Sequence, residues 1–160
     1  MSSKFVIAEE GHVAIAKYPA TSNGVTTLDA VNMENYSHIS MILVSGAAAG
    51  TDIVATVYAS TDASATSAEL VAFNYYQETT ASTDVLGART LNSTTALTLD
   101  NSATTNIFAV VELDASELPE GHNWVNMTLT DSTNATNIIC CIYVLSGARY
   151  GGPESPTVIA

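Results

Sequence analysis

The sequence predicts an all-β protein, a two-sheet antiparallel β-sandwich of jelly-roll-like form with an extended N-terminal arm and a C-terminal tail. Segments in which apolar residues alternate recur along the chain, turn-forming residues separate them, and no segment has the period of a long helix. Strands spaced by about 8–12 residues without crossover helices are typical of sandwiches and barrels. The pattern does not choose between the jelly roll and other Greek-key topologies.

The regular strands are expected to begin after residue 36. Ile39, Met41 and Leu43 share one face of the first strand. Residues 52–60 alternate again beyond the glycine-bounded loop at 46–50, which predicts a hairpin with a long turn. Further strands are predicted at residues 70–77, 85–91, 96–99, 107–113, 124–130 and 137–145.

Two of these strands indicate where the core lies. In residues 124–130 the apolar positions alternate with Asn126 and Thr128, which we expect to face solvent. Residues 137–145 are apolar on both faces, as in a central strand. The predicted core includes Val125, Met127, Leu129, Ile107, Val111, Ile142 and Val144.

The two ends of the chain differ from its middle. Gly11, Pro19 and Asn23-Gly24 interrupt residues 1–30, which predicts an arm with short strands near residues 4–8 and 13–16. The sandwich domain is then expected at residues 31–150 and a tail at residues 151–160. The alternative is that the arm is an edge strand of its own sandwich. The spacing of Asp114 and Glu117 fits a capping box and predicts a single helical turn.

The charge balance narrows the choice of partners. Sixteen acidic residues face four basic ones, Lys4, Lys17, Arg89 and Arg149, so this chain of 160 residues has a net charge of −12. Nucleic-acid binding needs clustered cations that displace counterions, so neither a nucleic acid nor an anionic membrane is expected as a partner. No apolar run reaches the ~18 residues of a membrane span. No secretory signal is visible, and we expect synthesis in a cytoplasm.

The sequence predicts no catalytic, cofactor or metal site, and therefore no enzyme. There is no G-x-S-x-G elbow, and His12, His38 and His122 lie in unrelated contexts. The acidic residues around His12 and at 114–120 lack metal-site spacing and are interpreted as solvated charge, with a structural Ca²⁺ left open. Cys140 and Cys141 are neighbours, so on a strand they point to opposite faces and cannot easily pair.

Binding to other proteins is the class of function that remains. The apolar start of the arm and the apolar tip of the tail are set apart from the regular strands and suit contact with a partner. The candidate interface residues are Lys4, Phe5, Val6, Ile7, Lys17, Arg149, Tyr150, Val158 and Ile159. Trp124, Tyr75, Tyr76 and Tyr150 offer an alternative, a sugar-stacking platform, although such aromatic residues more often complete a core or an interface.

The order of several segments resembles a known group of proteins. The run MILVS at residues 41–45 leads into GAAAG, and FAVVEL at 108–113, ELPEG at 117–121 and IYVLSGARY at 142–150 follow. This order resembles small structural proteins encoded near the major capsid gene of tailed bacteriophages, some of which are head decoration (cement) proteins.

The resemblance implies a virion protein on the outer surface of the head. It implies a β-sandwich subunit that binds the major capsid protein between capsomers of an HK97-like shell and stabilises that shell. It also implies a homo-oligomer, with a trimer favoured over a dimer. The alternative function is that of a carbohydrate- or receptor-binding β-sandwich of a phage tail or fibre, and an internal tail or neck component is a third possibility.

Overall fold

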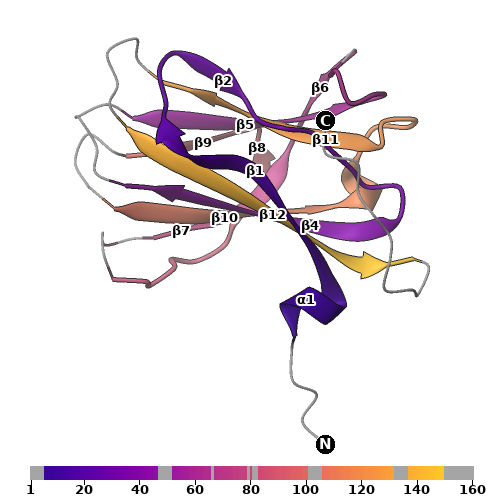
Figure 1. Cartoon of the computed structure of the whole chain (residues 1–160), viewed down its shortest axis with the longest axis horizontal. Helices are drawn as coiled ribbons and strands as arrows, with labels where there is room; N and C mark the ends of the chain where they lie inside the picture. Colours follow the sequence, from indigo (N-terminus) through magenta and orange to yellow (C-terminus); the bar gives the residue numbers. More distant parts are fainter. Residues whose placement is uncertain are drawn as a thin grey trace, which may run out of the picture.

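The structure, a computed structural model, describes residues 6–46, 52–65, 67–78, 80, 83–100, 106–131 and 137–149. Two antiparallel sheets pack face to face, as Figure 1 shows, which confirms the predicted all-β sandwich. The elements in chain order are α1 (Ile7–Glu10), β1 (Gly11–Thr21), β2 (Val25–Thr27), β3 (Val31–Asn32), β4 (Tyr36–Ser45), β5 (Ile53–Ser60), β6 (Glu69–Val71), β7 (Phe73–Gln77), β8 (Thr90–Thr94), β9 (Ala96–Leu99), β10 (Ile107–Asp114), η1 (Ala115–Glu117), β11 (Trp124–Thr130) and β12 (Ile138–Ala148).

The strand pairing is that of a jelly roll. The first sheet has the order β1-β12-β4-β10-β7-β8, and the second has the order β2-β11-β5-β6, with β3 also on β11 and β9 also on β5. The pairs are nested, because β1 pairs with β12, β2 with β11, β4 with β10, and β5 with β6 and β9. A long hairpin rolled into two sheets produces this nesting. The pairing therefore decides the topology that the sequence pattern left open.

The core lies between the sheets and takes one face of each long strand. Ile39, Met41 and Leu43, which share one face of β4, are fully buried. They share this face because successive side chains of a strand point to opposite sides of its sheet. The predicted core residues of β10 and β11 are buried as expected, namely Ile107, Val111, Val125, Met127 and Leu129. The structure adds the inward face of β5, which is formed by Ile53, Ala55, Val57 and Ala59.

Two predicted connections are wrong. β4 and β5 do not form a hairpin, since β4 pairs with β10 and β12 in the first sheet and β5 pairs with β11 in the second. The strand predicted at residues 70–77 is divided between β6 and β7, which lie in different sheets on either side of Ala72. Alternation shows which face of a strand is buried, but it does not show which sheet the strand joins.

The inward face of β12 is the opposite of the predicted one. Tyr143 and its alternate neighbours are fully buried, whereas Ile142 is half-buried on the outer face and Val144 lies outside the core cluster. Both faces of this strand are apolar, so the pattern did not distinguish them. β12 is nevertheless a central strand, between β1 and β4, as predicted. The inward residues of β12 are Ile139, Cys141, Tyr143 and Leu145.

The prediction that Asn126 faces solvent is also wrong. Asn126 lies on the outer face of β11 but is only 2% exposed, and Thr128 on the same face is half-buried. Its cross-strand neighbour is Tyr58 of β5. A ring at such a position, about 5 Å away, shields a short amide side chain.

Tyr143 connects the two sheets through the core. Its hydroxyl accepts a hydrogen bond from the backbone N–H of Met127 at 3.1 Å. β2 ends at Thr27 and β3 begins at Val31, so the strand pairing of β11 is interrupted beside Met127. Because a buried N–H without a partner is costly, the phenol from the opposite sheet replaces the missing strand partner. Burial raises the pKa of this phenol well above its usual value.

The N-terminal region belongs mostly to the sandwich. β1 is an edge strand of the first sheet, paired with β12, and Ala14 and Ala16 are in the core. Within the described residues the sandwich therefore begins at Gly11 and not at residue 31. For β1, the alternative prediction of an edge strand within its own sandwich is the correct one. The strand expected at residues 4–8 is replaced over Ile7–Glu10 by the short helix α1. Lys4, Phe5 and the predicted tail lie outside the described residues.

Two local predictions are confirmed. Asp114 and Glu117 form the expected capping box at the single turn η1. Cys140 and Cys141 are free thiols on opposite faces of β12, with Cys141 buried and Cys140 half-buried.

The strand expected near residues 85–91 is displaced along the chain, since β8 spans Thr90–Thr94.

Candidate functional site

The outer face of the first sheet carries two surfaces of different chemistry. Registered rows of side chains cross its strands, and one row runs through Ile15, Ile142, Ile42, Val110 and Tyr76, from β1 to β7. This row is apolar almost throughout. None of its side chains belongs to the core between the sheets.

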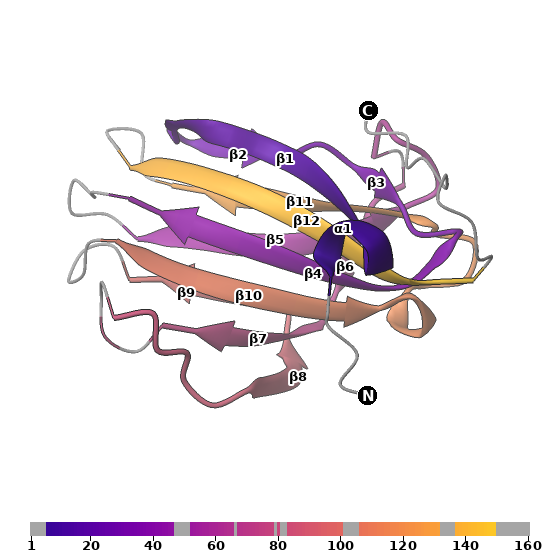
Figure 2. The same cartoon turned by 60° about the horizontal axis from the view of Figure 1, so that its bottom comes forward.

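The neighbouring row changes from apolar to polar across the sheet. It begins with Val13 on β1 and Val144 on β12, and continues with Ser40, Glu112 and Asn74 on β4, β10 and β7. Along this row the β1 side is therefore hydrophobic, and the β10–β7 side is hydrophilic. Figure 2 shows β1 at one edge of this sheet and β7 and β8 at the other.

We call the hydrophobic part the apolar surface. Val13 and Ile15 lie two positions apart on the same face of β1 and are 45% and 39% exposed. The helix α1 projects from the start of β1, in front of this face in Figure 2, and Val6 and Ile7 are 36% and 41% exposed there. The apolar surface consists of Val6, Ile7, Val13, Ile15, Val44 and Ile138.

The edge of β1 is not suited to pairing with a further strand. Its register shifts between Ile15 and Lys17 and again between Lys17 and Ala20, and Pro19 lies in the second shift. Bulges, proline and lysine on an edge strand hinder strand addition. A partner of this region would therefore bind the side chains of the outer face, not the backbone of the edge.

The structure brings together only some of the predicted interface residues. Val6 and Ile7 belong to the apolar surface, and Lys17 is half-buried on the same edge strand. Arg149 is exposed just beyond β12, where its backbone N–H donates to the carbonyl of Asn35. Lys4, Phe5, Tyr150, Val158 and Ile159 lie outside the described residues.

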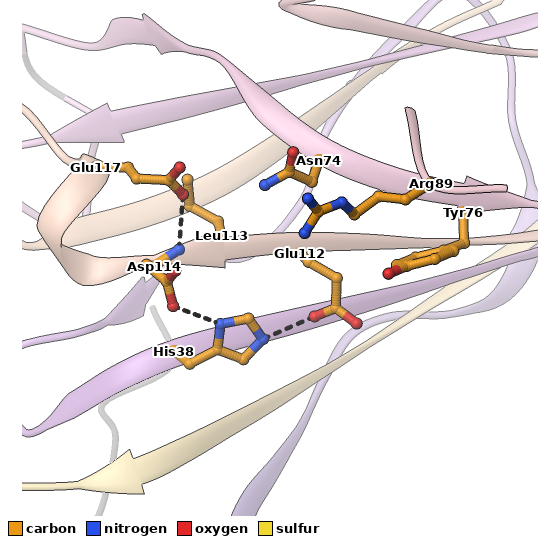
Figure 3. Close-up of a pocket in the computed structure, with 8 residues that line it drawn as sticks. All are labelled: His38, Asn74, Tyr76, Arg89, Glu112, Leu113, Asp114 and Glu117. Carbon is orange, nitrogen blue, oxygen red and sulfur yellow. Dashed lines mark hydrogen bonds and ion pairs between the residues drawn. The ribbon is translucent and has the colours of Figure 1, made fainter. Parts of the chain in front are cut away.

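The hydrophilic part of the face contains a pocket of about 230 Å³. Strands β4, β7 and β10 supply its floor, and Arg89 and η1 supply its sides (Figure 3). The lining residues are His38, Asn74, Tyr76, Arg89, Glu112, Leu113, Asp114 and Glu117.

His38 is held between two carboxylates of the neighbouring strand. Its Nε2 lies 2.8 Å from Oε2 of Glu112, and its Nδ1 lies 2.9 Å from Oδ1 of Asp114. A carboxylate only accepts hydrogen bonds, so both ring nitrogens donate and the ring is a cation. The hydrogen bond to Glu112, together with the one to Asp114, raises the pKa of His38 to about 9, although burial opposes the shift.

The other groups of the pocket are arranged around this triad. The Ser40 hydroxyl donates to Oε2 of Glu112 at 2.6 Å, and the Glu117 carboxylate accepts from the backbone N–H of Asp114 at 3.0 Å. Arg89 extends toward the same carboxylates in Figure 3, but among the described residues it makes no ion pair.

This pocket could not be predicted from the sequence alone. In the sequence His38 lies in a context unrelated to the other histidines, and Asp114 and Glu117 are interpreted as solvated charge. The signal that was available is the spacing of Glu112 and Asp114, which places two acids on one face of a predicted strand. Their partner His38 lies 74 residues from Glu112 in the sequence, and only the pairing of β4 with β10 brings them together.

The described part of the chain contains no group of three or more His, Cys, Asp and Glu side chains placed to hold a metal ion. Within the same residues, no helix is long and apolar enough to cross a membrane.

Comparison with known proteins gives little further information. No protein-family model matches the chain, and no curated protein matches it. Among solved structures, the chain is similar to the crystal structure of SPBc2 prophage-derived protein YomS, with 17% sequence identity and a TM-score of 0.45. The match covers 86% of this chain and 94% of that one.

Proposed function

We propose that this protein is a binding-only structural protein of a tailed-phage particle, which attaches to the outside of the head and stabilises the shell. The apolar surface carries this proposal. It places exposed apolar side chains from α1, β1, β4 and β12 on one side of a sandwich whose core is already complete. Contiguous exposed apolar side chains are a common mark of a protein–protein interface.

The charge of the chain supports a protein partner. With sixteen acidic and four basic residues, the free subunits repel one another and stay in solution. Although the chain is acidic, the side chains that form the apolar surface are all uncharged. A partner that binds these side chains therefore does not have to bury a carboxylate from among them. A capsid surface that is apolar at its centre and basic around it would complement this side of the protein.

The jelly-roll topology and the order of the sequence segments support the location. Jelly rolls are frequent among viral capsid domains and lectins, although a fold alone does not determine function. The segments at residues 41–50, 108–113 and 142–150 occur in the order that resembles head decoration proteins. On the shell we expect trimers or dimers, which multiply a small contact over many sites.

Particles that lack this protein provide the test. The purified protein is mixed with such particles, and binding is followed by co-sedimentation and by electron microscopy. We expect density on the head. Density only on the tail would favour the receptor-binding alternative, and no binding to any part of the particle would overturn the proposal.

Matched valine variants test the attachment surface. Val13→Asp places a charge on the apolar surface, and Val25→Asp places the same charge on β2 of the second sheet, where Val25 is 69% exposed. We expect the first variant to lose roughly tenfold or more in affinity and the second to bind as the wild type does. Equal binding by both variants would show that the apolar surface is not the attachment site.

A further inference from the structure

The pocket on the first sheet offers a mixture of hydrogen-bonding groups that the proposed attachment does not use. Tyr76 lies on β7, four strands from β1, which is roughly 19 Å at the spacing of neighbouring strands. A partner on the β1 side can therefore leave this pocket open to solvent.

Donors and acceptors lie close together in this pocket. The guanidinium of Arg89 offers five N–H donors in a fixed plane, and it makes no hydrogen bond or ion pair among the described residues. The carboxylates of Glu112, Asp114 and Glu117 offer acceptors and line the same cavity. Figure 3 shows the Arg89 side chain reaching across the pocket above Glu112, with the ring of Tyr76 beside both.

The charges of the lining residues disfavour a charged ligand. Three carboxylates oppose an anion, and Arg89 together with the cationic ring of His38 opposes a cation. The sum of these charges, three negative and two positive, is close to zero. This lining suits a neutral molecule that is rich in groups able both to donate and to accept hydrogen bonds.

We propose that this pocket binds a neutral saccharide ring. Each sugar hydroxyl donates to one group and accepts from another, which matches carboxylates placed beside a guanidinium. The ring of Tyr76 offers an apolar face to the C–H side of the sugar. The cavity of about 230 Å³ is below the ~300 Å³ at which pockets for drug-sized ligands begin, so it fits one ring and leaves the rest of a chain outside.

The test is a titration of the full chain with glucose, galactose and N-acetylglucosamine, followed by amide chemical shifts. We expect the shifts of residues in β7 and β10 around the pocket to move for at least one of these sugars. Glucuronate and glucosamine are added as anionic and cationic relatives, and both should bind more weakly. No change at the pocket for any neutral sugar, or tighter binding of a charged one, would overturn the proposal.

Variants with matched controls identify the residues that bind. Arg89→Ala and Tyr76→Ala should each weaken the sugar affinity by roughly tenfold or more. Arg149→Ala, at the other exposed arginine, and Tyr58→Ala, on the second sheet, should leave it unchanged. Arg89 is exposed, so its variant tests the site even if loss of the Tyr76 ring disturbs folding. Undiminished binding by Arg89→Ala would overturn the assignment.

These results are independent of the proposed attachment to a phage head. A protein that coats particles without binding sugars would refute only the saccharide site, and a protein that binds sugars without coating particles would refute only the attachment.

Discussion

The hydrogen bond between Tyr143 and Met127 can be tested by removing a single oxygen atom. Tyr143→Phe keeps the buried ring and deletes only the hydroxyl that accepts from the Met127 N–H at 3.1 Å. Both residues are fully buried, so water does not reach the donor that is left behind. A buried donor without a partner costs about 1–3 kcal/mol. We expect the free energy of unfolding to fall by that amount.

Urea denaturation followed by the fluorescence of Trp124, the single tryptophan, measures this loss. Each kcal/mol also lowers the Tm by roughly 2–4 °C in a domain of this size. Tyr58→Phe is the control, because Tyr58 is half-buried on the outer face of the second sheet and its change should stay within about 0.5 kcal/mol.

Amide exchange gives a second, local readout of the same bond. In the Tyr143→Phe variant the Met127 amide should exchange faster than its neighbours on β11, because the bond that protects it is gone. If this variant is as stable as the wild type and its Met127 amide stays protected, another acceptor holds that N–H and our account of the sheet-to-sheet bond is wrong.

Two further predictions concern the pocket and the core. The pKa of His38 is raised from 6.5 to about 9 by its carboxylate partners, so its contribution to stability is fully present below pH 6.5 and is lost as the pH rises through about 9. Relative to His38→Gln, the wild type should lose on the order of 1 kcal/mol of stability over that interval in urea melts, since solvent screens the partly exposed pairs; parallel curves for the two proteins would contradict this. On β12, Leu145→Ala should cost about 2–5 kcal/mol and Ile142→Ala markedly less, because only Leu145 lies in the core. Equal losses would mean that the outer face of this strand is as tightly packed as the inner one.

The fold class and most of the strands could be predicted from the pattern of apolar and polar residues along the chain. Trp124–Thr130 was predicted with the bounds that the structure shows, and Ile107 and Val111 of β10 were correctly placed in the core. In each of these strands one face is apolar and the opposite face is less apolar. The alternation of apolar residues with a period of two therefore shows which face of the strand is buried. The capping box joins Asp114 and Glu117, which are only three residues apart, so it could also be predicted from the sequence.

The tertiary structure alone decided which strands are neighbours. β4 and β5 follow each other in the chain but lie in different sheets, and the side chains of β12 that face inward are the opposite of those predicted. The contacts that decide these matters join residues far apart in sequence, such as Met127 with Tyr143 and His38 with Glu112. Alternation along a strand records burial but carries no information about the partner strand. The topology and both candidate binding surfaces therefore emerge only when the two sheets form.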